Sequence, residues 1–108
     1  MSSEQIKGHL DGLLMAILEH GPCHGYGIIE QLRTRSDDVF DLPEGTVYPA
    51  LHRLERNGMV TSKAEPVGGR TRRVYRLSHR GRTALAKRRC DWSRFAFAVS
   101  TVLGAAPA

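Results

Sequence analysis

The sequence is poor in cysteine and has no long hydrophobic run. Its two cysteines, Cys23 and Cys90, lie far apart in 108 residues, so we expect reduced thiols, with a redox pair as the remaining alternative. The longest nearly uncharged stretch, residues 95–108, is rich in alanine and too short to span a bilayer. The chain does not open with a signal-peptide pattern. We therefore expect a cytoplasmic, single-domain protein that has no membrane partner.

Acidic residues are scarce in the second part of the chain. Residues 1–45 contain 3 basic and 8 acidic side chains, a net charge of −5, whereas residues 46–108 contain 13 basic and 3 acidic ones, a net charge of +10. This asymmetry favours a polyanion such as nucleic acid as the partner of the second part. From charge alone, a solvated basic face is the simpler alternative.

Motifs for catalysis and for cofactor binding are also lacking. The sequence contains no P-loop, dinucleotide fingerprint or nucleophile elbow. His20, Cys23 and His24 lie close together in the sequence, but no carboxylate or further thiol accompanies them at metal-ligand spacing. We therefore expect no enzymatic activity, no cofactor and no metal site.

What the sequence does contain is a series of apolar repeats typical of short amphipathic helices. Such repeats cover residues 10–18, 26–32 and 47–54. The second helix should begin near His24, and its broad apolar face should contain Tyr26, Ile29 and Leu32, with Gly25 and Ile28 flanking it. Gly21-Pro22 and a polar run at residues 36–38 separate the first three helices.

The third of these helices contains a proline, which helps to locate its start. Pro49 is tolerated in the first turn, where the backbone amide has no partner, but not in a helix interior. We therefore place the start at Gly45 or Thr46, with one of them as the N-cap. Gly58 follows Asn57 and suits the left-handed residue after the helix end.

A hairpin and a last helix follow. Residues 59–65 and 72–77 are the expected strands, residues 66–69 form the turn, and Ser78 caps the helix. The helix carries a heptad-like apolar seam that Arg88 interrupts. The seam residues are Leu85, Trp92, Phe95, Val99 and Val102. The predicted fold class is mainly α with a small β-hairpin: a winged helix-turn-helix region over residues 1–78, then a dimerisation helix and tail over residues 79–108.

The third helix and the hairpin together favour binding to double-stranded DNA. The major groove admits one α-helix, and the third helix has a polar face opposite its apolar one. This polar face carries Tyr48, Pro49, His52, Arg53 and Arg56. Glycines and arginines at the hairpin tip, residues 68–73, are typical of a wing that contacts phosphates or the minor groove.

Three segments of the sequence resemble the PadR family of transcriptional regulators, in its short form with a single C-terminal helix. They are His24-Gly25-Tyr26, residues 42–55 (LPEGTVYPALHRLE) with Gly58, and residues 69–78 with Gly81. The resemblance spans residues 6–85. It implies a winged helix that forms a homodimer through its first and last helices. It also implies repression at a palindromic operator, relieved by a small molecule.

The resemblance also implies roles for individual residues. DNA-facing positions fall on Thr46, Tyr48, Pro49, His52, Arg53, Arg70, Arg72 and Arg73, with Lys7 as a further phosphate contact. The expected dimer interface consists of Leu10, Leu14, Leu85, Trp92, Phe95, Val99 and Val102. Gly25 should permit close helix packing, and Tyr26 should support the core.

Three further interpretations remain open from the sequence. Trp92 and Phe95 could line a pocket for a planar aromatic effector at the dimer interface, or could simply pack. The protein could instead be an interaction module whose last helix binds a partner chain. RNA binding is a weaker alternative, because Tyr75 is the only aromatic residue of the expected sheet and should face the core.

Overall fold

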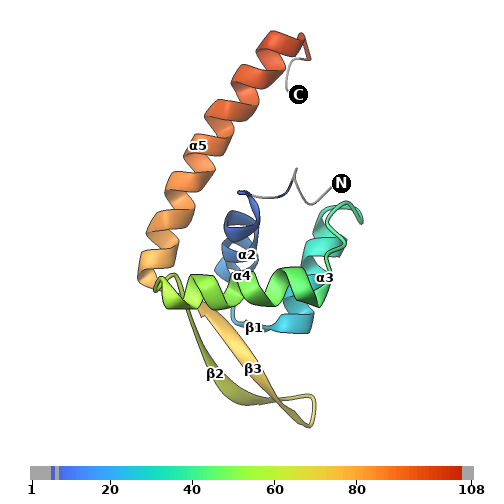
Figure 1. Cartoon of the computed structure of the whole chain (residues 1–108), viewed down its shortest axis with the longest axis vertical. Helices are drawn as coiled ribbons and strands as arrows, with labels where there is room; N and C mark the ends of the chain where they lie inside the picture. The colour runs from blue at the N-terminus through green and yellow to red at the C-terminus, as the bar shows by residue number, and fades with distance from the viewer. Residues whose placement is uncertain (1–5, 7, 106–108) are drawn as a thin grey trace.

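The computed structural model describes Ile6 and residues 8–105, which form four helices and a three-stranded antiparallel sheet (Figure 1). In chain order the elements are α2 (Leu10–Glu19), β1 (Cys23–His24), α3 (Gly25–Arg35), α4 (Glu44–Arg56), β2 (Val60–Val67), β3 (Arg70–Leu77) and α5 (His79–Leu103). The sheet order is β1-β3-β2. This architecture confirms the predicted fold class, a winged helix-turn-helix followed by a long helix.

The core lies where α2 meets α3, α4 and the sheet. Leu14, Ile28, Val47 and Leu51 are completely buried there, as is most of Tyr75 on β3. Full burial of one such aliphatic side chain stabilises the fold by about 1.5–3 kcal/mol. The apolar repeats predicted for α2 and α4 are thus confirmed, and Tyr75 faces the core as expected.

Helix α3 is turned slightly from the predicted orientation, toward the residues expected to flank its apolar face. Gly25, Ile28 and Leu32 are buried, whereas Tyr26 is 56% exposed. The reason lies just before the helix, in the short strand β1, where His24 pairs with Val74 of β3. This pairing sets the rotation of the first helical turn. Tyr26 therefore does not support the core, and that prediction was wrong.

Helix α4 begins earlier than predicted. Its first residue is Glu44, and Pro43 is the N-cap, whose carbonyl oxygen accepts from the amides of Thr46 (3.0 Å) and Val47 (3.2 Å). Pro49 consequently lies inside the helix, beyond the first turn. A proline there removes one intrahelical hydrogen bond, and it is tolerated because this side of α4 faces solvent.

The hairpin is longer and its turn tighter than predicted. Strands β2 and β3 pair from Val60 with Leu77 out to Val67 with Arg70, which leaves only two residues in the loop. Gly68 and Gly69 form that loop with φ angles of 58° and 80°. Two successive left-handed residues match the twist of a two-residue hairpin, and glycine adopts this conformation without strain.

Ser78 caps α5, as predicted from the sequence. Its Oγ accepts from the Gly81 amide at 3.0 Å and lies 2.6 Å from the Gly58 carbonyl oxygen, to which it donates. We expect Ser78→Ala to lower the free energy of unfolding by about 1 kcal/mol, because the Gly81 amide in the first turn loses its acceptor. Urea denaturation followed by circular dichroism measures this. Ser78→Thr should keep the parent stability, and a fully stable alanine variant would contradict the assigned role of the cap.

Leu85 is the last buried residue of α5, and the outer part of this helix extends away from the body of the molecule (Figure 1). The chain measures 51 × 28 × 23 Å, and its radius of gyration of 15.0 Å exceeds the roughly 13 Å of a compact domain of this size. The outer part of α5 exposes Trp92, Phe95, Phe97, Val99, Val102 and Leu103. No helix in the described ranges is long and apolar enough to cross a membrane.

Candidate nucleic-acid interface

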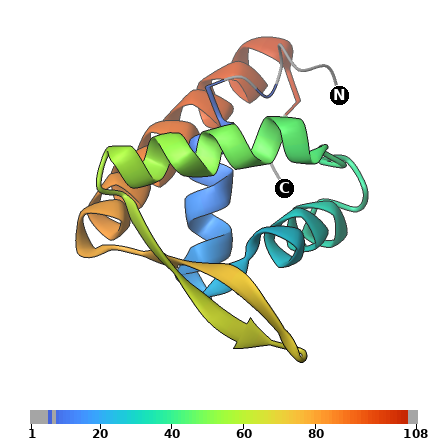
Figure 2. The same ribbon diagram turned by 60° about the horizontal axis from the view of Figure 1, so that its bottom comes forward.

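The exposed side of α4 is polar and lies next to the hairpin. In Figure 2, α4 (green) runs across the front of the other helices and the hairpin projects below it. The inward face of α4 is fully apolar and buried. Pro49, His52, Arg53 and Arg56 remain exposed, so the structure leaves the predicted polar face open to a partner.

Gly25 allows the start of α3 to approach α4 closely. A Cβ atom at Gly25 would lie 2.1 Å from the Tyr48 hydroxyl oxygen, which is too close for any side chain there. The structure thus confirms that Gly25 permits close helix packing. Burial raises the pKa of the Tyr48 hydroxyl, so this group stays protonated and can both donate and accept a hydrogen bond.

A cleft of about 180 Å³ lies between the start of α3 and the hairpin. It is lined by His24, Gly25, Tyr26, Tyr48, Thr71, Arg72 and Arg73. The Arg72 guanidinium lies 5.8 Å from the centre of the Tyr26 ring, a cation–π distance. A hydrogen bond to Glu44 raises the pKa of the Tyr26 hydroxyl. Tyr26 thus connects α4 to the wing instead of filling the core.

The wing arginines differ in their contacts. Arg70 is exposed beside the glycine turn, and Arg72 lies over Tyr26. Arg73 extends toward the other strand, where its Nη1 donates to the Ser62 hydroxyl at 3.2 Å. None of the three forms an ion pair with another described residue. Their charges are therefore available to an anionic partner.

The two arginines on the exposed face of α4 also differ. Arg53 forms an ion pair with Asp11 of α2. Arg56 lies on the same face, and the ion pairs of the described part of the chain do not include it. The resemblance did not assign Arg56 to DNA, although the helical periodicity placed it on this face. Its exposure makes it an additional candidate contact.

Thr46 and Lys7 are the two remaining residues that were predicted to face DNA. Thr46 is half-buried in the first turn of α4, next to its N-cap. Lys7, the expected phosphate contact before α2, lies outside the described residues.

His20, Cys23 and His24 do not form a metal-binding group within the described ranges. Burial raises the pKa of the Cys23 thiol, which lowers its reactivity.

Three of the seven residues predicted for the dimer interface are buried within a single chain. Leu10, Leu14 and Leu85 are only 8%, 0% and 3% exposed, because they pack in the core of a single chain. They have little surface left for a second chain, and their place in the interface stays a prediction. The other four predicted residues, Trp92, Phe95, Val99 and Val102, are exposed on α5.

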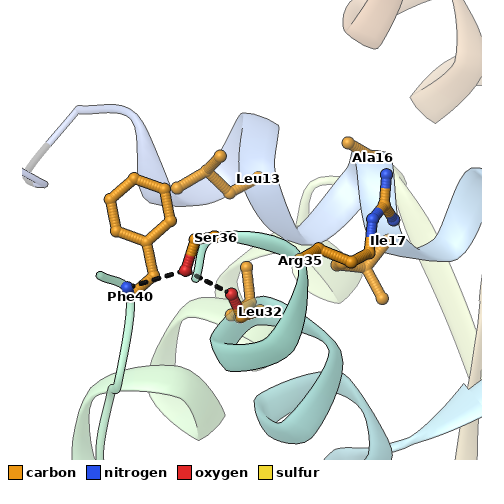
Figure 3. Close-up of a pocket in the computed structure, with 7 residues that line it drawn as sticks. All are labelled: Leu13, Ala16, Ile17, Leu32, Arg35, Ser36 and Phe40. Atoms are coloured by element: carbon orange, nitrogen blue, oxygen red, sulfur yellow. Dashed lines mark hydrogen bonds between the residues drawn. The ribbon is translucent and has the colours of Figure 1, made fainter. Parts of the chain in front are cut away.

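A second pocket, of about 160 Å³, lies between α2, α3 and the loop that follows α3 (Figure 3). It is lined by Leu13, Ala16, Ile17, Leu32, Arg35, Ser36 and Phe40. The Ser36 hydroxyl is already engaged, since it donates to the Leu32 carbonyl at 2.6 Å and accepts from the Phe40 amide at 2.8 Å.

Trp92 and Phe95 line neither this pocket nor the cleft beside the wing. Within one chain, Trp92 instead packs edge-on against His9 at 5.3 Å.

Comparison with known proteins agrees with this geometry. Residues 13–87 match the transcriptional regulator PadR-like family. Transcriptional regulator Rv3488 of Mycobacterium tuberculosis is 41% identical over 76 residues, which is 68% of each chain. A PadR family regulator from Clostridium difficile R20291 is 35% identical with a TM-score of 0.77, covering 89% of this chain and 98% of the other. A transcriptional regulator from Clostridium thermocellum is 27% identical with a TM-score of 0.84, covering 94% and 96%. This chain therefore belongs to the PadR-like family of transcriptional regulators.

Proposed function

We propose that this protein is a sequence-specific transcriptional repressor that binds a palindromic operator as a homodimer and is released by a small molecule. The observation that carries the proposal is the single surface formed by the polar face of α4 and the basic wing. α4 has the dimensions to enter a major groove, where His52, Arg53 and Arg56 can reach base edges. Arg70, Arg72 and Arg73 then contact flanking phosphates or the minor groove.

The homodimer rests on the exposed apolar seam of α5. Trp92 and Phe95 lie side by side, with ring centres 6.0 Å apart, and the seam continues through Val99 and Val102. Such a stripe on a helix that extends from the body is costly to leave in water, and a second copy of α5 can cover it. Two copies place two α4 helices to read half-sites about one helical turn apart, or a multiple of that.

Selection from a random duplex library, followed by sequencing, tests the proposal. It is run at near-physiological salt, and the oligomeric state is measured in parallel by light scattering. A palindrome recovered by a dimer supports the proposal. Binding that is salt-sensitive but blind to sequence contradicts it, and so does a stable monomer that ignores DNA, which instead favours the protein-interaction module.

Release by a small molecule rests on Trp92. Its indole is half-exposed, beside Phe95 and His9, in the part of α5 proposed to meet a second chain. A planar aromatic compound can stack at such a junction once the dimer encloses it. Because Trp92 is the single tryptophan of the chain, its fluorescence reports this binding directly.

The seam makes a specific prediction about Phe95. We expect Phe95→Glu to convert the dimer to a monomer, because the new charge would lie in the apolar interface. Operator affinity should then fall roughly a hundredfold or more, since the second half-site is no longer bound by the same particle. Sedimentation and fluorescence anisotropy measure the two effects.

Phe97→Glu is the matched control. Phe97 is also exposed on α5, but it lies about 200° around the helix from Phe95 and outside the seam. This variant should remain a dimer and keep its operator affinity. If both variants dimerise like the parent, α5 is not the interface.

A further inference from the structure

Asp11, in the first turn of α2, lies where three helices meet. Its Oδ1 pairs with Nη2 of Arg53 on α4, and its Oδ2 is 4.0 Å from Nη2 of Arg88 on α5. Arg88 also donates from Nη1 to the Gly8 carbonyl oxygen at 3.2 Å. The Asp11 side chain is only 20% exposed. It is therefore a fixed anion between the helix proposed to read DNA and the helix proposed to form the dimer.

Arg53 is held through one of its nitrogen atoms only. Its side chain is 46% exposed, and among the described residues Nη2 alone has a hydrogen-bond partner. The second N–H of Nη2 and the donors of Nη1 and Nε are left for an external acceptor, so Nη2 can still form a parallel donor pair with either neighbouring nitrogen. An arginine has a flexible stem, and a side chain that is ordered beforehand loses less conformational entropy when it binds.

We propose that Asp11 is a positioning residue that orients Arg53 for reading a base, and so determines part of the sequence selectivity. This inference rests on the proposed function. A guanidinium that reads guanine must present two donors in the plane of the base. Anchoring Nη2 on rigid α2 restricts that plane, whereas an unanchored Arg53 can contact phosphates of any sequence.

The negative charge of Asp11 does not oppose this role. Two arginines face the carboxylate, so the cluster of Asp11, Arg53 and Arg88 has a net positive charge. Arg88 continues to neutralise Asp11 when Arg53 shifts toward a base. The cluster therefore attracts DNA while it limits the directions in which Arg53 can point.

Asp11→Asn tests the proposal, with Glu19→Gln as its matched control. Glu19 also lies on α2 and pairs with an α5 arginine, Arg89, at 3.0 Å, and none of its ion pairs or side-chain hydrogen bonds with the described residues involves α4. Both variants remove one negative charge. Relative to Glu19→Gln, we expect Asp11→Asn to bind the selected operator about two- to fivefold more weakly and an unrelated duplex equally well, as suits an exposed ion pair.

Two results would overturn the inference. Asp11→Asn could match Glu19→Gln on both duplexes, or it could bind both duplexes more tightly, which would mean that Asp11 competes with DNA for Arg53. A double-mutant cycle locates the effect: in an Arg53→Gln background, Asp11→Asn should not weaken operator binding further. A further loss there would also overturn it.

The same measurements separate this inference from the proposed function. If the parent protein selects no duplex sequence, the proposed function is contradicted, and so is this inference, which depends on it. A parent that selects an operator, with Asp11→Asn and Glu19→Gln behaving alike, overturns only the role of Asp11. Melting temperatures of both variants are compared first, so that loss of folding is recognised as such.

Discussion

Replacing Arg70, Arg72 and Arg73 together with glutamine should weaken binding to every duplex by about two orders of magnitude near 0.1 M salt. Each arginine that neutralises a phosphate releases a counterion, which contributes about 0.9 to the slope of log affinity against log salt. Three lost contacts should therefore flatten that slope by about 2.7. The sequence preference should survive, because α4 is unchanged. Fluorescence anisotropy over a range of salt concentrations measures both quantities.

The control for the wing variant changes the same amount of charge elsewhere. Arg80, Arg82 and Arg94 are exposed on α5, away from the glycine turn at the hairpin tip and outside the apolar seam. Their joint replacement by glutamine should leave the salt slope nearly unchanged. If both triple variants flatten the slope equally, the protein attracts DNA through its net charge only and the hairpin does not act as a wing.

Gly81→Ala should strongly destabilise this fold. In the first turn of α5, a Cβ at Gly81 would lie 2.1 Å from the backbone oxygen of Met59 and 2.6 Å from a methyl carbon of Leu77. A backbone atom cannot move aside as a flexible side chain can. We expect a loss of about 3 kcal/mol, at the upper end of overpacking effects. This corresponds to a melting temperature lower by more than about 10 °C, measured by calorimetry.

Gly45→Ala provides the comparison. Gly45 also lies in the first turn of a helix, α4, but apart from its chain neighbours and the backbone of its own helix, no described atom lies within 4 Å of the position its Cβ would take. Alanine is there up to about 1 kcal/mol more favourable than glycine, so this variant should melt at or above the parent temperature. If Gly81→Ala melts within a few degrees of the parent, the junction between the hairpin and α5 is looser than the structure indicates.

The sequence predicted those parts of the fold that burial alone decides. The repeats of Leu14 in α2 and of Val47 and Leu51 in α4 have one apolar side each, and that side must be covered. Ser78 and Gly58 were predictable because capping chemistry is local. The exposed polar face of α4 followed from the same periodicity, and so did the basic character of the wing.

Other features could not be predicted, because they depend on contacts between distant residues. Strand β1 has two residues, too few to show a period, yet its pairing rotates α3 and exposes Tyr26. The ion pair between Asp11 and Arg53 joins positions 42 residues apart. Leu85 packs in the core of a single chain, and the sequence could not predict this, because a helical repeat shows that a position is apolar but does not show which neighbour covers it.

The connection between the hairpin and α5 at Ser78 is short and rigid. Strand β3 ends at Leu77 and α5 begins at His79, so one residue separates them. The backbone amide of that residue donates to the Met59 carbonyl at 3.0 Å, while its hydroxyl holds the first turn of α5. A change in the angle of α5 is therefore passed to the hairpin instead of being absorbed by a loop. In a dimer built on α5, a rotation of one α5 against the other would therefore move each hairpin and change the distance between the two wings.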